Sequence, residues 1–182
     1  MLKYLFIFFF SILITDTNAN NKKKIINNLI NTKNLNFEFE QNINGKIENG
    51  NCIIEYPKKI FCKYLKNNDK ILVSNGKSLV IKTSTSFYRY PLQKTPLNLI
   101  LDKKYLIKKI NHLNAKIIDR SLINYTIIEN NNEINVFFDN KTFDLIGWQT
   151  KDIYQNLSIT LLSAIQINQK ISNNVFKLPL QN

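Results

Sequence analysis

Hydrophobic and polar residues alternate along this chain with two different periods. Over residues 21–31 the apolar side chains recur at the spacing of one helix face, which predicts an amphipathic helix. These apolar positions are Ile25, Ile26, Leu29 and Ile30. From residue 35 onward the period falls to two, and apolar residues alternate with Asn and Glu. That alternation is typical of a β-strand with one face in water.

Turn signals separate the strand-like runs at short intervals. The strongest is Asn75-Gly76, which predicts a two-residue hairpin turn with both residues at positive φ. The strands that we expect lie at 35–41, 51–56, 60–66, 70–74, 78–83, 86–90, 115–119, 122–129, 134–139, 142–150 and 156–168, with a further edge strand at 175–178. Ten or eleven strands in hairpin order predict a mainly β fold with a few α-helices, in which an antiparallel sheet curls towards a barrel.

One short apolar segment interrupts this β pattern in the middle of the chain. The aromatic run that ends at Pro91 is followed by Thr95-Pro96, where Thr95 suits a helix cap and Pro96 suits the first turn. The helix that follows would carry Leu97, Leu99, Ile100 and Leu101. So many apolar groups in so few residues predict a helix that lies on an apolar surface. Residues 103–110 continue as a lysine-rich helical or irregular piece.

The N-terminus is typical of a secretory signal peptide. Residues 4–14 are apolar except for Ser11, and they are too few for the roughly 20 residues that span a bilayer as a helix. Lys3 precedes this run, and the small residues Thr17 and Ala19 follow it. We therefore expect cleavage after Ala19, which leaves residues 20–182 as a single exported, periplasmic domain.

The formal net charge of +12 raises nucleic acid as a partner, but other features argue against it. A signal peptide directs the chain away from nucleic acid. The two arginines are Arg89 and Arg120, whereas readers of phosphates and bases favour arginine. Lysine is abundant together with asparagine and isoleucine, all residues of A/T-rich codons, so codon bias accounts for much of the charge. A basic face towards anionic lipid or an acidic partner stays open.

The sequence offers no constellation for catalysis. His112 is the single histidine, and it stands without a neighbouring nucleophile. The acidic pairs Glu38/Glu40 and Asp139/Asp144 read as exposed strand and turn positions. No cluster of His, Cys or Asp has the spacing of a metal site. We therefore expect no enzymatic activity, no cofactor and no metal.

Cys52 and Cys62 flank Pro57 symmetrically and share the parity of the apolar residues around them. If the two strands form a hairpin centred on Pro57, the two cysteines face each other on one side of the sheet. An oxidising compartment then permits a disulfide. Two free thiols packed as core hydrophobes are the alternative that the sequence leaves open.

Six motifs, in this order, resemble those of the outer-membrane lipoprotein carrier family, LolA. They are FEFEQ at 37–41, the block from Gly45 to Tyr64, ILVSNGK at 71–77, YPLQKTPL at 90–97 with the leucines to 101, LIGW at 145–148 with Asp152, and FKLP at 176–179. The fourth motif resembles the α-proteobacterial branch of the family. No single motif is specific, whereas six in order are.

The resemblance implies an unclosed barrel with a helical lid over a hydrophobic cavity. It implies a periplasmic shuttle that takes acylated lipoproteins from an inner-membrane LolCDE-type ABC transporter and delivers them to a LolB-type receptor. The physical need is plain, because each acyl methylene exposed to water costs about 0.8 kcal/mol. We expect such a carrier to work as a monomer.

The resemblance also implies roles for particular residues. Ile60 stands where the family places a large apolar residue three positions after the proline. The cavity wall and the underside of the lid are expected to comprise Leu35, Phe37, Phe39, Ile54, Ile60, Tyr64, Leu97, Ile100 and Leu101. For each of these the alternative is ordinary core packing.

Tyr56 is the main departure from the family pattern. The family has an arginine immediately before the proline, and it reaches across to bond the lid backbone. Tyr56 offers one O–H donor instead of the arginine fork. We expect Tyr56 to take part in lid control, with weaker closure than in the family.

Two other readings of the sequence compete with a carrier. A LolB-type acceptor carries an acylated cysteine just after its signal peptide, and Cys52 lies too far along the chain for that role. A structural or adhesive envelope protein would have the same strands around a filled core and would bind no lipid. A continuous apolar cavity under residues 97–101 separates the carrier from the structural protein.

Overall fold

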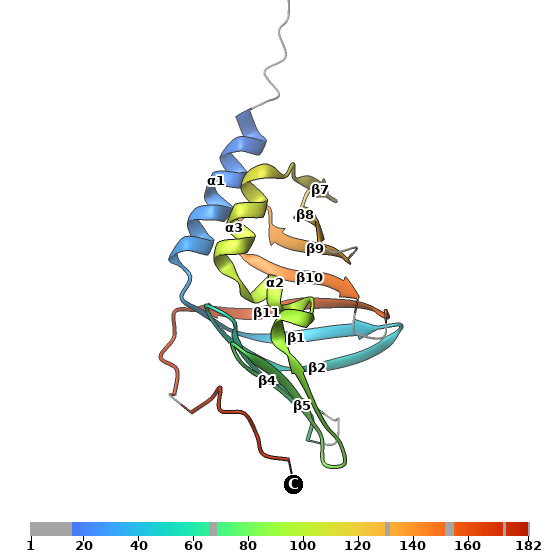
Figure 1. Ribbon diagram of the computed structural model, residues 1–182. Coiled ribbons are helices and arrows are strands. Elements are labelled where there is room, and N and C mark those ends of the chain that lie inside the picture. The colour runs from blue at the N-terminus through green and yellow to red at the C-terminus, as the bar shows by residue number, and fades with distance from the viewer. Residues whose placement is uncertain (1–15, 66–68, 130–131, 152–154, 173, 182) are drawn as a thin grey trace, which may run out of the picture.

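A single strongly bent sheet forms most of the molecule, and it is described here from a computed structural model (Figure 1). The structure describes residues 16–65, 69–129, 132–151, 155–172 and 174–181. Eleven antiparallel strands follow the order β6-β5-β4-β3-β2-β1-β11-β10-β9-β8-β7. The two edge strands β6 and β7 do not pair with each other, so the sheet is an unclosed barrel, as the sequence predicts.

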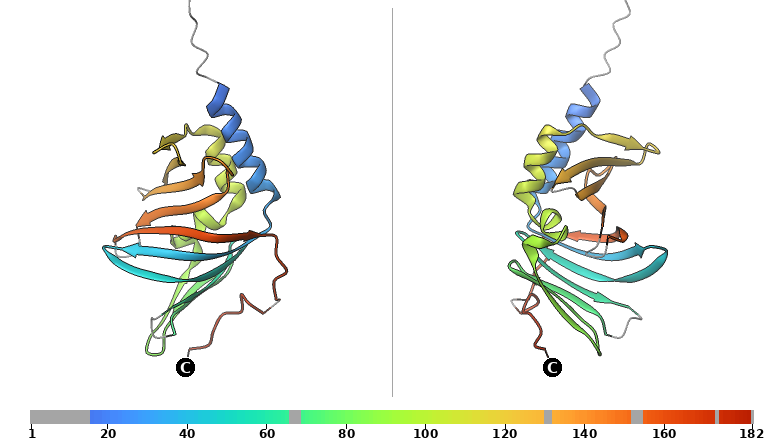
Figure 2. Two further views of the ribbon diagram at one scale, coloured as in Figure 1. Left: turned by 180° about the vertical axis from the view of Figure 1, so that it is seen from behind. Right: turned by 45° about the vertical axis from the view of Figure 1, so that its right-hand side comes forward.

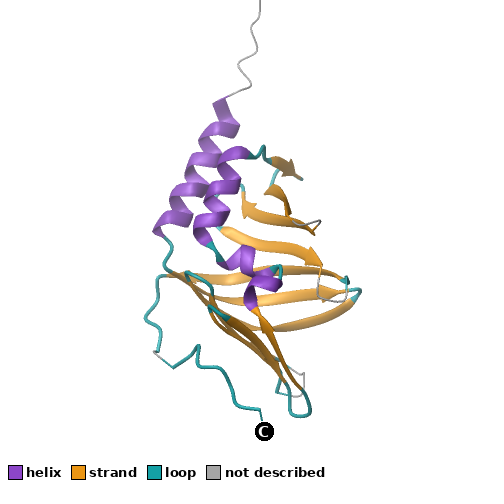
Figure 3. Ribbon diagram, viewed as in Figure 1, coloured by secondary structure: helices purple, strands orange, loops and turns teal. Residues whose placement is uncertain are grey.

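Strands and helices lie close to their predicted positions. The strands are β1 (Asn34–Ile43), β2 (Lys46–Glu55), β3 (Lys59–Tyr64), β4 (Ile71–Asn75), β5 (Ser78–Lys82), β6 (Phe87–Pro91), β7 (Lys116–Ile118), β8 (Leu122–Glu129), β9 (Asn132–Asp139), β10 (Leu145–Lys151) and β11 (Leu157–Ile167). The helices are α1 (Asp16–Asn31), the 3₁₀ turn η1 (Leu92–Lys94), α2 (Leu97–Leu101) and α3 (Lys103–His112). Figure 3 shows that the helices gather on one side of the sheet.

The first and last strands join the two halves of the sheet. β1 pairs with β2 on one side and with β11 on the other, so the chain returns to its starting strand. The β1–β11 register shifts between Asn36 and Glu38, which marks a β-bulge. Bulges of this kind bend a strand and increase its twist. The bulge therefore lies at the centre of the sheet, where its two halves meet.

The hydrophobic core lies between the sheet and the two long helices. α1 and α3 lie side by side over the β8–β10 half in all three views (Figures 1 and 2). Ile25 of α1 and Leu106 of α3 are fully buried and belong to the same hydrophobic cluster as Tyr125 and Phe138 of the sheet. Of the four residues of the predicted apolar face of α1, Ile25 and Leu29 are buried and Ile26 is partly buried, whereas Ile30 is 54% exposed. Among the described residues, no helix has both the length and the apolarity needed to cross a bilayer.

Three predictions at the ends of elements need correction or lie partly outside the described chain. Residues 175–178 form no strand, because Val175 and Lys177 make local backbone bonds within a turn rather than a ladder. Helix α1 begins at Asp16, earlier than expected. The predicted signal peptide lies largely in residues 1–15, outside the described residues, and its last residues belong to the first turn of α1.

The β4–β5 hairpin forms where predicted, but its turn is shifted by one residue. Of the pair Asn75-Gly76, only Gly76 has a positive φ, at +94°. Asn75 ends β4, and its Oδ1 accepts hydrogen bonds of 3.0 Å from the backbone N–H groups of Lys77 and Ser78. An Asn side chain that bonds the backbone two residues on stabilises a turn in this way. The two-residue loop is therefore Gly76-Lys77.

Candidate functional site

A cavity of about 410 Å³ lies between the inner face of the sheet and the segment that follows β6. Its volume is within the roughly 300–1,000 Å³ typical of small-molecule sites. We call residues 92–101, which comprise η1 and α2, the lid. The lid contributes Thr95, Pro96 and Leu97 to the lining. Strands β1 to β6 contribute Phe39, Gln41, Ile43, Cys52, Ile60, Cys62, Tyr64, Leu72, Leu79, Ile81, Tyr88 and Tyr90. Strands β10 and β11 contribute Trp148, Thr150, Lys151, Ser158 and Thr160, and Lys70 completes the lining.

Four of the nine predicted wall residues line this cavity: Phe39, Ile60, Tyr64 and Leu97. The other five lie in the hydrophobic core cluster outside the lining, at 0–4% exposure. They are Leu35, Phe37, Ile54, Ile100 and Leu101. Parity along a strand decides which face a side chain occupies, but it does not decide whether helices or the cavity lie opposite. Leu35 and Phe37 precede Phe39 on the inward face of β1, and they pack in the core.

Sequence reasoning missed much of the lining. Tyr88 and Tyr90 of β6 and Leu79 of β5 belong to it, on the half of the sheet closest to the lid. Ser158 and Thr160 of β11 also belong to it. Their shared parity with the buried Leu162 is the sequence signal that could have placed them on the inner face. No pattern in the sequence around Ser158 and Thr160 identifies which residues they face across the cavity.

Cys52 and Cys62 are opposite each other in the β2–β3 register and form a cross-strand disulfide in this structure. Their Cα atoms are 4.1 Å apart. Both residues are 4–5% exposed, and both belong to the cavity lining. The bridge therefore ties together the two strands that form the floor of the cavity.

The first end of the lid is held by one backbone hydrogen bond to the β4–β5 turn. Leu92 is 1% exposed, and its N–H donates to the carbonyl of Lys77 at 2.9 Å. Thr95 does not cap α2 as predicted, because its hydroxyl donates backward to the carbonyl of Leu92 at 2.8 Å. The Thr95 side chain thus closes η1 and leaves α2 to begin after Pro96, which occupies the helical region at φ −57°.

The second end of the lid is held by Lys58, in the β2–β3 turn. The backbone N–H of Lys58 donates to the carbonyl of Leu101 at 2.9 Å. Its ammonium group lies 3.2 Å from the Oδ2 of Asp102. Asp102 also caps α3, because its Oδ1 accepts from the backbone N–H of Tyr105 at 3.1 Å. One lysine therefore bonds the end of α2 and the start of α3 at once.

Tyr56 does not hold the lid by a hydrogen bond, in contrast to its predicted role. Its hydroxyl is buried and has no hydrogen-bond partner among the described residues. Burial raises the pKa of this hydroxyl. The ring packs beside the core cluster, with the ammonium of Lys103 at 5.6 Å from its centroid. The bond to the lid backbone that was expected from Tyr56 comes from Lys58 instead, two residues further on.

Polar side chains line the cavity at the strand ends opposite the β2–β3 and β4–β5 turns that hold the lid. Gln41 donates from Nε2 to Ser158 Oγ and Thr160 Oγ1, both at 3.1 Å. Tyr64 donates from its hydroxyl to Gln41 Oε1 at 3.3 Å. We call these four residues, together with Lys70, the polar end of the cavity. All five residues contribute to the lining.

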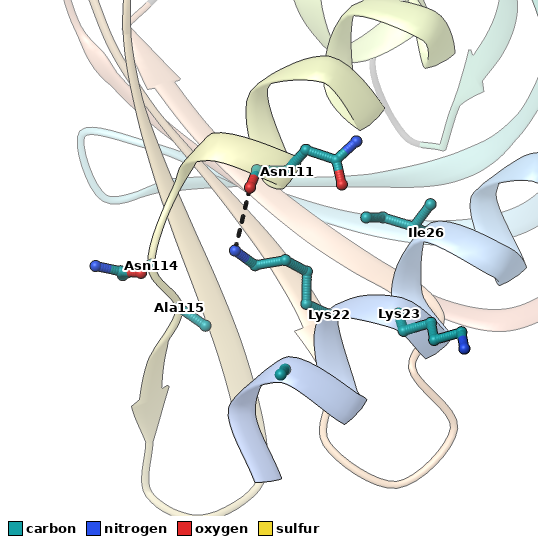
Figure 4. Close-up of a pocket in the computed structure, with 7 residues that line it drawn as sticks. Lys22, Lys23, Ile26, Asn111, Asn114 and Ala115 are labelled. Atoms are coloured by element: carbon teal, nitrogen blue, oxygen red, sulfur yellow. Dashed lines mark hydrogen bonds between the residues drawn. The ribbon is translucent and has the colours of Figure 1, made fainter. Parts of the chain in front are cut away.

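A second hollow of about 530 Å³ lies between α1 and the end of α3 (Figure 4). Its lining is Ala19, Lys22, Lys23, Ile26, Asn111, Asn114 and Ala115. Lys22 crosses it and donates from Nζ to the carbonyl of Asn111 at 3.3 Å. No residue of the lid contributes to this hollow, whose walls come from α1, the end of α3 and the residues that follow it.

The described residues contain no group of three or more His, Cys, Asp or Glu side chains arranged for a metal ion. His112, the single histidine, is exposed at the C-terminal end of α3. The main cavity combines an apolar wall, one polar end and a lid held at two points.

The family model for "Outer membrane lipoprotein carrier protein LolA" matches residues 30–179. No curated protein matches the sequence.

Several solved structures have a similar fold despite very low sequence identity. An uncharacterized conserved protein from Thermus thermophilus has a TM-score of 0.52 at 6% identity, with 88% of this chain and 94% of that chain covered. The LolA superfamily protein NE2245 from Nitrosomonas europaea has a TM-score of 0.46 at 7% identity, over 88% and 97%. LprF from Mycobacterium bovis has a TM-score of 0.44 at 10% identity, over 86% and 98%.

Proposed function

The chain belongs to the outer membrane lipoprotein carrier protein LolA family, and on that premise we propose that it carries the acyl chains of lipoproteins through the periplasm. The observation that supports this proposal best is the 410 Å³ cavity beneath a lid held at two points. The members of this family are periplasmic carriers rather than enzymes. The α-proteobacterial type of this chain stays a prediction.

The size of the cavity limits what the closed form holds. If a methylene takes about the 30 Å³ that a water takes in the liquid, the cavity holds on the order of a dozen methylenes. That is one acyl chain, so a triacylated client requires the lid to move outward. Shielding about a dozen methylenes is worth roughly 10 kcal/mol relative to water, which explains why a carrier is needed at all.

The lid is suited to such movement because its fixed points lie at its ends. Leu92 and Leu101 bond the neighbouring turns, while Thr95, Pro96 and Leu97 between them face the cavity. Release of one end enlarges the cavity without breaking the sheet. A client then enters when it binds the open form better than the closed form, by a difference of a few kcal/mol.

The proposed partners are those of the family. The carrier takes acylated lipoproteins from an inner-membrane LolCDE-type ABC transporter and delivers them, as a monomer, to a LolB-type receptor in the outer membrane. A structural or adhesive envelope protein with a filled core is the weaker alternative: of the expected segment 97–101, Leu97 lines the cavity, while Ile100 and Leu101 pack in the core.

Release of a lipoprotein from inner-membrane spheroplasts tests the proposal. The purified protein should release a labelled lipoprotein into the supernatant, and Leu97→Asp should lower this release strongly because Leu97 lies on the cavity wall. The matched control is Ile128→Asp, since Ile128 is 72% exposed on β8, outside the cavity. No release by the wild-type protein, beside an active known carrier, would contradict the proposal.

A further inference from the structure

The polar end of the cavity has hydrogen-bond donors that the protein itself does not use. Gln41 donates both amide hydrogens, one to Ser158 Oγ and one to Thr160 Oγ1. Each hydroxyl oxygen therefore acts as an acceptor, and its own hydrogen remains to be donated. In the part of the chain that the structure describes, neither hydroxyl donates to a protein acceptor. Ser158 and Thr160 are 6% and 4% exposed, so bulk water reaches them poorly.

A buried donor without an acceptor is costly, which makes this arrangement informative. Polar groups in protein interiors are nearly always bonded, and a missing bond costs about 1–3 kcal/mol. A cavity for hydrocarbon alone would be lined by apolar residues at these inward positions. Ser158 and Thr160 lie two positions apart on the same face of β11, with Thr160 opposite Gln41 and Ser158 opposite Ile43, so both hydroxyls can donate to one acceptor group.

The charges beside the polar end favour an anion. Lys70 lines the cavity, and its ammonium lies 4.0 Å from the ring centroid of Tyr64 and 2.5 Å from Glu48. Lys46 binds the other oxygen of the same carboxylate at 3.2 Å. Burial opposes ionisation of Glu48, but the hydrogen bonds and charges of Lys70 and Lys46 outweigh it and hold the pKa of the carboxyl below its ordinary value. Two lysines share one carboxylate, so this group has a net charge of about +1.

We propose that the polar end binds the anionic, hydrogen-bond-accepting head group of a single-chain amphiphile, whose acyl chain lies along the apolar wall towards the lid. The ligand class is a long-chain carboxylate or an alkyl phosphate. The hydroxyls of Ser158 and Thr160 donate to the head group, and the hydroxyl of Tyr64 orients Gln41. This inference rests on the proposed acyl-binding cavity and adds a second kind of ligand to it.

Binding of three probes with the same chain tests the inference. Tetradecanoate, tetradecyl phosphate and tetradecan-1-ol are titrated below their aggregation limits into the purified protein by calorimetry. The double substitution Ser158→Ala/Thr160→Val removes the two donors and keeps the shape of the wall. The control is Ser163→Ala, on the same strand but exposed and on the outer face.

We expect the two anionic probes to bind more tightly than the alcohol. Hydrogen bonds to charged groups are strong, so the double substitution should weaken binding of at least one anionic probe by about tenfold. Binding of the alcohol and of every probe to Ser163→Ala should change by less than about threefold. Whichever anion loses more affinity identifies the head group as carboxylate or phosphate.

Two other outcomes separate this inference from the proposed function. If all three probes bind with equal affinity and the double substitution has no effect, the head-group site is wrong and the acyl cavity stands. If none of the probes binds, the cavity does not take acyl chains in this form, and both proposals fall. Circular dichroism of each variant confirms that a loss of binding does not come from a loss of folding.

Discussion

Lys58 offers the sharpest test of how the lid is held. Lys58→Met keeps the aliphatic stem and the backbone N–H but removes the ammonium that lies 3.2 Å from Asp102. The two side chains are 35% and 27% exposed, so solvent screens the pair and its contribution is about 0.2–1 kcal/mol. The opening equilibrium of the lid should therefore rise by about 1.4- to 5-fold.

Hydrogen exchange of the Lys58 amide measures this change directly, because that N–H donates to the carbonyl of Leu101 at the end of the lid. We expect the protection of this amide to fall by the same factor of about 1.4 to 5 in Lys58→Met. Acyl-probe binding should become faster in the same proportion if opening limits entry.

The chain provides a matched control for this experiment. Lys59 pairs with Glu55 at the same distance of 3.2 Å and with similar exposure, 41% and 37%, but neither residue bonds the lid. Lys59→Met should leave the protection of the Lys58 amide unchanged. Equal effects from both substitutions, or no effect from Lys58→Met, would refute the role of Lys58 as the anchor of the lid.

Three further predictions concern the floor and the polar end of the cavity. Replacing Cys52 and Cys62 by alanine removes a bridge that closes a loop with a sequence separation of 10. The unfolding free energy measured by denaturant titration should fall by about 2.7 kcal/mol. Mass spectrometry that finds two alkylatable thiols without reductant would contradict the bridge. Ile60→Glu should fold, as judged by circular dichroism, but lose lipoprotein release, because the new carboxylate can reach the cavity. Ile54 is opposite Ile60 in the β2–β3 register but is fully buried in the core, so Ile54→Glu should unfold the protein. Glu48→Gln should lose less stability than the wild type as pH falls below about 4. The pKa of Glu48 is lower in the folded protein than its ordinary value of about 4.3, so the ionised carboxylate stabilises the fold above that value and this contribution is lost as the carboxylate is protonated. Identical acid titrations of the two proteins would show that the Lys70 pair is not stabilising.

The strands could be predicted because each carries its own evidence. The alternation over residues 35–41 reports a wet face and a dry face directly, and the turn residues mark where each strand ends. The hairpin centred on Pro57 likewise follows from the symmetric placement of Cys52 and Cys62. Residues 175–178 were wrongly predicted as a strand, since a short apolar run does not reveal whether a neighbouring edge is within reach.

The site was predicted less completely, because it depends on contacts between distant segments. The parity of Leu35, Phe37 and Phe39 is right, yet only the last of them reaches the cavity. The lid anchor joins Lys58 to Leu101, and no local pattern signals such a contact. Tyr56 was expected to hold the lid from its position alone.

The contacts at the polar end of the cavity could likewise be predicted only in part from the sequence. Gln41 continues the inward parity of β1, so its position facing the cavity could be read from the sequence. Its bonds to Ser158 and Thr160 could not, because they depend on the pairing of β1 with β11. Register between the first and last strands is a property of the folded sheet rather than of either segment.

Photo-crosslinking tests the central claim most directly. A lipoprotein whose acyl chain carries a diazirine is bound, irradiated and mapped by peptide mass spectrometry. We predict adducts on the cavity wall, in particular at Leu97, Tyr88 and Leu79. Leu161 is an apolar reference on the outer face of β11, with 45% exposure. Adducts at Leu161 with none on the wall would contradict an acyl chain bound beneath the lid.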